Sequence, residues 1–222
     1  MRGKNISAED LTAKKELALE VIRRLKAEYP DAGCTLDYDH AWQLLVSVRL
    51  AAQCTDARVN IVVQDLFAKY PSVAALAEAE PEDIEVIVKP CGLGRSKARD
   101  ISACMRMLRD KYDCKVPTTF EELLALPGVG RKSANLIMGD VFGKPAIVTD
   151  THCIRLCNKI GLVDGIKEPQ KVEMALWKIV PPEEGSDLCH RFVMHGRAVC
   201  NARKPECEKC CLSDICRYAR EE

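Results

Sequence analysis

The 222-residue sequence has few aromatic residues, few glycines and prolines, and no long apolar run. Aromatic residues make up only 5% of the chain, beside 12 glycines and 11 prolines. Strands favour aromatic residues, so this composition disfavours a large all-β fold. No apolar run approaches the roughly 18 residues that a membrane span requires, and the charged N-terminus lacks the apolar core of a signal peptide. We therefore expect a cytoplasmic protein that does not bind a membrane.

An excess of one charge sign is also lacking, because 33 Lys and Arg residues balance 33 Asp and Glu residues. The chain has no global basic signature of a nucleic-acid-binding protein. The charges are unevenly distributed, however: residues 89–132 hold ten basic and five acidic side chains, whereas residues 72–88 hold five acidic and no basic ones. Solvated faces of neighbouring helices would explain this pattern, and the basic segment is also compatible with a phosphate-binding face.

Apolar residues recur at helical spacing along nearly the whole chain. Leu17, Val21 and Leu25 share one helix face, and Pro30 ends that helix. The β-branched run at 146–149 is too short to build a sheet, and no repeat or low-complexity linker divides the chain. The pattern predicts an all-α fold. Its expected helices cover residues 12–29, 40–52, 56–70, 72–78, 81–88, 95–112, 119–126, 131–142, 151–160, 168–180 and 186–200.

Cysteine, by contrast, is abundant, with 13 residues. The odd total and the absence of a secretory signal disfavour a disulfide framework. Nine cysteines lie scattered, mostly among apolar neighbours, and are expected to be small buried side chains. The other four, Cys200, Cys207, Cys210 and Cys216, lie within 17 residues and can converge on one centre if the backbone loops around it.

Four cysteine ligands suit either a zinc ion or an iron–sulfur cluster. Structural zinc usually takes its ligands as two close pairs separated by a longer segment. Here only Cys207 and Cys210 form a close pair, and the other two cysteines flank it. This spacing favours a [4Fe–4S] cluster and leaves zinc as the alternative. Cys211 is adjacent to Cys210 and is expected to point away from the centre.

The segment LPGVGRK at 126–132 is expected to join two helices through a tight turn. Pro127 ends the first helix, and Gly128 and Gly130 supply a permissive backbone. Backbone amides in such a turn and at a helix N-terminus form a phosphate site. Lys132 follows in the first helical turn, where the helix dipole and any partial burial would favour the neutral amine. A neutral amine is a nucleophile, and a phosphate-contacting lysine is the alternative interpretation.

Asp150, in the segment IVTDTH, precedes another expected helix. An aspartate in this position is a good helix N-cap. The capping role is compatible with a catalytic one, because an ionised carboxylate can also support a cationic intermediate or guide a proton.

These segments together resemble the endonuclease III family of helix–hairpin–helix DNA glycosylases and AP lyases. The resemblance rests on LPGVGRKSAN, VTDTH and the C-x6-C-x2-C-x5-C spacing, and AAQCTDARVN and CGLGRSKARDI also look like family segments. It covers roughly residues 12–218. It implies two helical domains flanking a DNA-binding cleft: a six-helix barrel at 34–145 that ends with the hairpin, and a cluster domain formed by 1–33 with 146–222.

The resemblance also implies roles for individual residues. Lys132 would be the nucleophile, and Asp150 would be its catalytic partner. Gln53 would fill the gap that a flipped base leaves, and Leu93 would part the opposite strand.

Further residues are expected to contact DNA. Asp56 and His152 would lie at the rim of the base pocket or near the DNA backbone. Gly128 and Gly130 would shape a phosphate contact. Among the basic residues, Arg131 and Lys97 are our first candidates for contact with DNA phosphates.

The implied activity is that of a bifunctional enzyme of base-excision repair. It would remove oxidised pyrimidines from double-stranded DNA and cut the strand 3′ to the abasic site by β-elimination through a lysine Schiff base. A structural [4Fe–4S] cluster would be its cofactor. It would act as a monomer, of bacterial type and associated with the nucleoid through DNA.

Two other functions compete with this interpretation. Adenine or mismatch glycosylases of the same superfamily usually lack a lysine at the hairpin position, so Lys132 argues against them. A non-enzymatic module with a zinc knuckle and a hairpin would need neither Lys132 nor Asp150.

Overall fold

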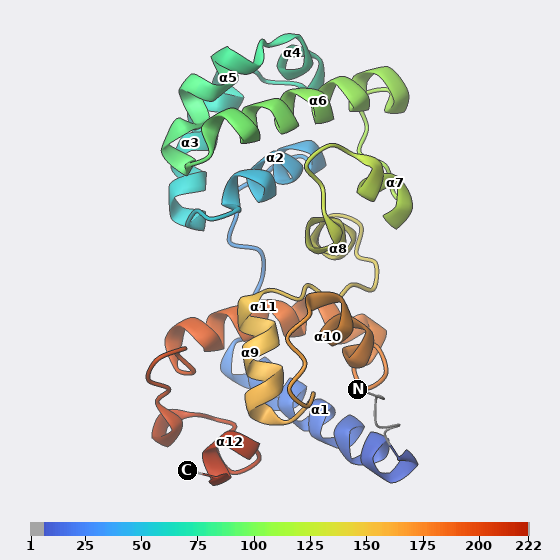
Figure 1. Ribbon diagram of the computed structural model, residues 1–222, viewed down its shortest axis with the longest axis vertical. Coiled ribbons are helices and arrows are strands. Elements are labelled where there is room, and N and C mark those ends of the chain that lie inside the picture. Colours follow the sequence, from blue (N-terminus) through green and yellow to red (C-terminus); the bar gives the residue numbers. More distant parts are fainter. Residues whose placement is uncertain (1–6, 222) are drawn as a thin grey trace. The chain divides into compact units, whose positions relative to one another are not determined.

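The computed structural model describes residues 7–221, and within this range the chain contains helices and no strand. The all-α fold that the sequence predicts is confirmed. The chain divides into two compact units, and the helices of each are labelled in Figure 1. One unit is Cys34–Gly143, and the other combines the residues before Cys34 with those from Lys144 onward.

The unit Cys34–Gly143 is built from helices, and capping side chains in the sequence mark the N-termini of three of them. Thr55, Ser72 and Thr119 cap α3, α4 and α7, and each side chain accepts a hydrogen bond from the backbone amide three residues on. The helices of this unit are α2 (Ala41–Ala51), α3 (Asp56–Lys69), α4 (Val73–Glu78), α5 (Pro81–Val88), α6 (Gly94–Tyr112), α7 (Phe120–Ala125) and α8 (Arg131–Asp140), with the 3₁₀ helix η1 (Lys89–Cys91) between α5 and α6.

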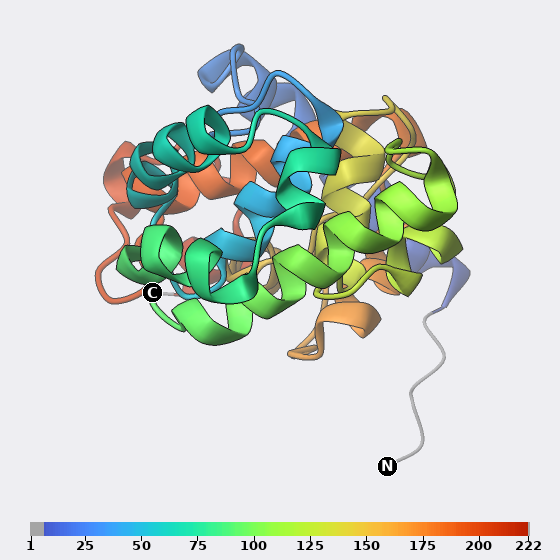
Figure 2. The ribbon, with the colours of Figure 1, turned by 90° about the horizontal axis from the view of Figure 1, so that it is seen from above.

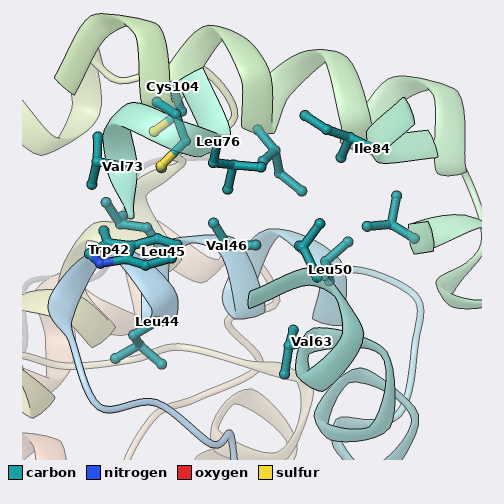
Figure 3. Close-up of a cluster of buried hydrophobic side chains, with 14 of the residues drawn as sticks. Trp42, Leu44, Leu45, Val46, Leu50, Val63, Val73, Leu76, Ile84 and Cys104 are labelled. Atoms are coloured by element: carbon teal, nitrogen blue, oxygen red, sulfur yellow. The ribbon is translucent and has the colours of Figure 1, made fainter. Parts of the chain in front are cut away.

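The core of this unit lies between α2 and the helices α4, α5 and α6. The long helix α6 runs beside α4 and α5 in both ribbon views (Figures 1 and 2). Val46 and Leu50 of α2 face Leu76 of α4 and Ile84 of α5 in the close-up of Figure 3, and all four are buried. Full burial of each such side chain contributes roughly 1.5–3 kcal/mol. This packing fixes the C-terminal end of α2 and the N-terminal end of α6, from which candidate DNA-contacting loops extend.

The second unit also consists of helices and connecting turns. Ser7 caps its first helix by accepting a hydrogen bond from the Asp10 amide at 3.1 Å. The helices α9 and α11 pack against each other, and α1 packs against α11. The elements of this unit are α1 (Ala8–Glu28), α9 (Thr151–Ile160), α10 (Pro169–Leu176), η2 (Pro182–Glu184), α11 (Gly185–Ala198), η3 (Cys207–Lys209) and α12 (Arg217–Glu221).

A few helix ends differ from those expected. The first helix begins at Ala8 instead of residue 12, because Ser7 supplies a cap that the apolar spacing did not reveal. Helix α10 ends at Leu176 instead of residue 180. The following residues form tighter turns ahead of Pro181, which disfavours helical backbone in the residue before it. The short α12 was not expected. No helix within residues 7–221 is long and apolar enough to cross a membrane.

Candidate active site and nucleic-acid interface

A tight turn joins α7 to α8 and forms the expected hairpin. The Val129 amide donates to the Leu126 carbonyl at 3.1 Å, which closes the turn. Gly128 has a φ of +76°, and a Cβ there would lie 2.8 Å from Asp100 Cβ and 3.1 Å from Arg49 Cδ. Arg49 Nε donates to the Asp100 carboxylate at 2.7 Å, so an ion pair from α2 and α6 packs against the turn. Both the backbone angle and the close approach require glycine at this position.

Gly130 is the N-cap of α8 and has different surroundings from Gly128. Its backbone is extended, and a Cβ at this position would meet nothing within 4 Å. Because a glycine N-cap has no side chain, it cannot accept hydrogen bonds from the first-turn amides of α8. A helix N-terminus of this kind suits an anion. Lys132 lies in this first turn and is exposed rather than partly buried, so its amine is accessible beside the open end of the helix.

The basic side chains near the hairpin lie in distinct environments. The Arg131 guanidinium carbon lies 5.0 Å from the centroid of the Phe120 ring, in a cation–π arrangement that orients the side chain. Lys97 does not lie at the surface, contrary to expectation. It is 0% exposed, and its buried position aligns with Ile101 and Met105, four and eight residues later on the same face of α6. The expectation that Lys97 contacts a phosphate is therefore wrong, and this spacing of apolar residues was the signal that could have shown it.

A shallow groove lies at the start of α6 and retains exposed basic side chains. Lys89, Arg95 and Arg99 are exposed there. Leu93 lies among them and is 57% exposed, which is unusual for a leucine and leaves an apolar tip in a basic groove. The groove is lined by Glu85, Lys89, Leu93, Gly94, Arg95, Ser96, Arg99 and Asp100.

Gln53 and Leu93 are both exposed and both adopt left-handed backbone. Their φ values are +58° and +52°, a region that residues with side chains rarely occupy. Gln53 lies in the turn after α2, and Leu93 is the N-cap of α6. Asp56, the first residue of α3, accepts a hydrogen bond from the Thr35 hydroxyl at 2.6 Å, which holds its carboxylate against the preceding segment.

Asp150 and His152 belong to the other unit. Asp150 caps α9, as expected, and its Oδ1 accepts from the Cys153 amide at 2.7 Å. His152 Nδ1 lies 3.2 Å from Arg155 Nη2. A Cβ at Gly196 of α11 would lie 2.4 Å from His152 Nδ1, so a glycine lets α11 approach the histidine closely. His152, the second residue of α9, is thus packed against α11.

The four clustered cysteines lie in the loop after α11. Burial raises the pKa of the Cys200 thiol, and Cys216 and Cys207 lie near enough to raise it further. Burial also raises the pKa of Cys210 to about 11, and Cys211, Cys200 and Cys216 contribute to that increase. All four side chains are thiols, which are soft donors, and they lie in one loop. Within residues 7–221, no three potential ligands are arranged to hold a metal ion.

Cys211 lies in a different environment from these four. Burial raises the pKa of its thiol, and Glu28 of α1 is the neighbouring charge that raises it further. Arg24, also of α1, donates from Nη1 to the Cys211 carbonyl at 2.9 Å. Cys211 thus contacts the first helix, although its thiol also lies near that of Cys210.

Comparison of the sequence with known proteins identifies a family and several similar proteins. Residues 46–182 match the family described as HhH-GPD superfamily base excision DNA repair protein. The chain is 42% identical over 211 residues to the endonuclease III of Synechocystis sp. (strain ATCC 27184 / PCC 6803 / Kazusa), an alignment that covers 95% of this chain and 96% of that protein. The chain belongs to the endonuclease III family of base-excision DNA glycosylases.

Other members of the endonuclease III family agree with this assignment in sequence and in fold. The protein of Escherichia coli (strain K12) is 38% identical over 204 residues, covering 92% of this chain and 96% of that protein. A structure of a trapped endonuclease III–DNA covalent intermediate superposes with a TM-score of 0.88 at 39% identity, covering 93% of this chain and 97% of that chain.

Three contacts in this chain were not predicted from its sequence. The Arg49–Asp100 ion pair supports the hairpin. Arg155 Nη2 donates to the Cys200 carbonyl at 2.8 Å and thus ties α9 to the start of the cysteine loop. His195 Nε2 lies 3.3 Å from the Cys210 sulfur. The segment HGRAVC places His195 five residues before Cys200, but nothing in that spacing indicated a contact with Cys210.

Proposed function

We propose that this chain is a bifunctional glycosylase and AP lyase that acts on oxidised pyrimidines and abasic sites in double-stranded DNA. One observation carries the proposal: Lys132 is exposed in the first turn of α8, immediately after the glycine-capped hairpin. A phosphate bound at the N-terminus of α8 would bring the adjacent sugar of the DNA backbone within reach of the Lys132 amine.

Lys132 would supply the nucleophile. Its neutral amine attacks C1′ of the sugar, the bond from C1′ to the base nitrogen breaks, and the base leaves with a proton. Loss of the amine proton and opening of the sugar ring give a Schiff base between Lys132 Nζ and C1′. This electron sink acidifies the 2′ hydrogen, and loss of that proton expels the 3′ phosphate. Water exclusion by the bound DNA would favour the neutral amine.

Asp150 would stabilise the positive charge that develops at the sugar. Its cap hydrogen bond with the Cys153 amide fixes the carboxylate and engages one of its two oxygens. The remaining lone pairs can face a cationic transition state, where a fixed negative charge lowers the barrier most.

Gln53 and Leu93 would hold the duplex open around an extruded nucleotide. A damaged base inside a duplex is inaccessible, so such enzymes must flip it out. Both side chains are exposed on left-handed turns. The basic groove beside Leu93, together with Arg131, would bind phosphates on either side. Asp56 and His152 would line the rim of the base pocket or the DNA backbone nearby.

Cys200, Cys207, Cys210 and Cys216 would hold a [4Fe–4S] cluster. The chemistry of the donors fits the group, because four thiols in one loop suit iron or zinc and no hard cation. Once bound, the group would supply binding energy that folds the loop and no chemistry at the sugar. Arg203 and Lys204 are exposed in this loop and would face phosphates. Zinc remains the alternative.

The proposal extends to the state in which the enzyme acts. We propose a monomer, because each damaged site is a single nucleotide and all the residues invoked belong to one chain. It would act where chromosomal DNA lies, in keeping with the cytoplasmic location expected from the sequence. The mass of the protein in sedimentation experiments, measured with and without duplex, tests whether it is a monomer.

A panel of duplexes tests the activity. Each duplex would carry one thymine glycol, one dihydrouracil, one abasic site or one A·G mismatch, and base release and strand cutting would be measured separately. We expect release and cutting at both oxidised pyrimidines, cutting at the abasic site, and no reaction at the mismatch. Base release without cutting, or reaction at the mismatch alone, would favour a mismatch glycosylase. Binding without either reaction would favour a non-enzymatic module.

A further inference from the structure

Lys97 is a buried charged side chain that the proposed chemistry leaves without a role. It is 0% exposed, and burial lowers the pKa of its amine. Burying an ammonium group is costly unless specific acceptors replace its water. A helix-forming apolar residue would fill this position of α6 more cheaply, so the lysine requires an explanation beyond packing.

The acceptors of Lys97 are two backbone carbonyls from separate segments. Its Nζ donates to the Leu50 carbonyl at 2.8 Å and to the Cys91 carbonyl at 2.8 Å. Leu50 lies in the last turn of α2, and Cys91 is the last residue of η1. Carbonyls at helix ends lack the partners that a continuing helix would supply. The Lys97 amine therefore satisfies one carbonyl at the C-terminal end of each of these two helices and joins the two ends.

Each anchored carbonyl lies two or three residues before a left-handed residue. Gln53 follows Leu50 by three positions, and Leu93 follows Cys91 by two. Among the residues that the structure describes, four non-glycine residues have positive φ, and these two are among them. Left-handed backbone at such residues persists only where the surrounding structure imposes it.

Two further contacts involve these loops. The Lys97 amide donates to the Leu93 carbonyl at 3.0 Å, which is the first backbone hydrogen bond of α6 and anchors Leu93 to the helix that carries Lys97. The Cys54 thiol, next to Gln53, lies close enough to Cys91 to contribute to its raised pKa. The loops that carry Gln53 and Leu93 thus converge on Lys97.

We propose that Lys97 is a positioning residue for DNA distortion, which sets the relative placement of the Gln53 and Leu93 loops. This inference rests on the proposed function, in which those two side chains occupy the opened duplex. Lys97 itself would touch neither DNA nor the reacting sugar. Its loss would let the two loops move independently, so that Gln53 and Leu93 could no longer support the extruded nucleotide together.

The variant that tests this is Lys97→Met, which keeps an unbranched apolar side chain and removes both hydrogen bonds. Lys97→Arg is the second variant, because it retains a charged donor and the ability to fold but cannot place one nitrogen on both carbonyls. Leu108→Ala is the matched control. It truncates a fully buried residue at the other end of α6 and destabilises the unit without touching either loop. Unfolding free energies of all three variants would be measured in parallel.

The readout is single-turnover strand cutting of one lesion in two contexts, in a duplex and in the unpaired strand. A single strand has no stack to open, so it does not need the two loops. We expect Lys97→Met to slow the duplex reaction by about ten- to a hundredfold, the size of effect that a small misplacement produces. The single-strand reaction should keep its wild-type rate. Lys97→Arg should show the same selectivity to a smaller extent, and Leu108→Ala should show none.

A double-mutant cycle separates positioning from general weakening. In a Gln53→Ala/Leu93→Ala background, Lys97→Met should have almost no further effect on the duplex reaction, because the side chains it positions are gone. Additive effects, equal losses on both substrates, or a wild-type duplex rate in Lys97→Met would each overturn the inference. Failure of the proposed function would look different, since the wild-type protein would then cut neither substrate.

Discussion

Asp150 has a structural role and a proposed catalytic role that substitution can separate. The side chain caps α9 through the Cys153 amide, and asparagine is as good a cap as aspartate. Asp150→Asn should therefore unfold at nearly the wild-type denaturant concentration, yet release the base on the order of a hundredfold more slowly, because it lacks the charge that stabilises the cationic transition state.

Asp150→Ala is the comparison that isolates the cap. It removes the acceptor of the Cys153 amide as well as the charge and should lower the unfolding free energy by about 1 kcal/mol. Equal base-release rates for Asp150→Asn and the wild-type protein would show that the carboxylate acts only as a cap.

At the same scale, Lys97 shows that the type of a residue alone can give a wrong prediction of its contacts. Lysine in a basic segment suggests a phosphate contact, and Arg95 and Arg99 beside it are indeed exposed. The structure shows Lys97 on the buried face of α6, and its four-residue spacing to Ile101 and then Met105 was the signal that the sequence prediction did not use. One of the two carbonyls that it binds belongs to Leu50, on another helix and distant in sequence, so the sequence alone did not indicate this pair of contacts.

At the scale of elements, the hairpin depends on two glycines for different reasons. At Gly128 an alanine would adopt a strained φ and bring its Cβ to 2.8 Å from Asp100 Cβ. Gly128→Ala should lower the unfolding free energy by about 1–3 kcal/mol, measured by denaturant titration. At Gly130 the backbone is extended and open, so Gly130→Ala should leave stability nearly unchanged.

At Gly130 we expect the substitution to change DNA affinity rather than stability. A methyl group there would stand where a phosphate approaches the first-turn amides of α8. We expect Gly130→Ala to weaken binding of abasic-site duplex in a fluorescence titration, although the fold is intact. Unchanged affinity would place the phosphate elsewhere.

The cysteine loop is the element whose stability should depend on its cofactor. Cys207→Ser should lose iron, and its loop from Cys200 to Cys216 should become sensitive to protease, because ligand binding energy is folding energy in such a loop. Cys211→Ser is the matched control and should retain its iron, since Cys211 lies beside Arg24 and Glu28. Metal analysis of the wild-type protein purified without oxygen should find iron, and one zinc without iron would contradict the proposed cluster.

At the scale of the whole molecule, binding should report released counterions. The logarithm of affinity for a lesion duplex should fall linearly with the logarithm of salt concentration. Arg95→Ala and Arg131→Ala should each reduce that slope by about one, because each removes one phosphate contact.

Lys115→Ala is the control for this series. Lys115 lies in the same basic segment but pairs with Asp113 just beyond α6, away from the groove residues. Its slope should match that of the wild-type protein. A reduced slope for Lys115→Ala, with none for Arg95→Ala, would move the binding face away from the groove.

The helical fold was predictable because helices form through signals between residues that are close in the sequence. These signals include apolar spacing, Pro30 and capping residues such as Thr55, which act within a few positions of the sequence. Most observed helices begin and end close to the positions that such signals indicate. The turn at Gly128 was predictable for the same reason. The left-handed turns at Gln53 and Leu93 were not, because neither residue is a glycine whose backbone freedom would mark such a turn in the sequence.

The central claim is that Lys132 forms a covalent bond with the sugar. Borohydride reduces a Schiff base to a stable amine, so incubation with abasic-site duplex and borohydride should yield one protein–DNA adduct. Mass spectrometry of the digested adduct should assign the bound sugar to Lys132. Lys132→Gln, which keeps most of the side-chain volume, should bind the duplex but form no adduct and leave the strand intact. An adduct on another residue, or wild-type cutting by Lys132→Gln, would contradict the account.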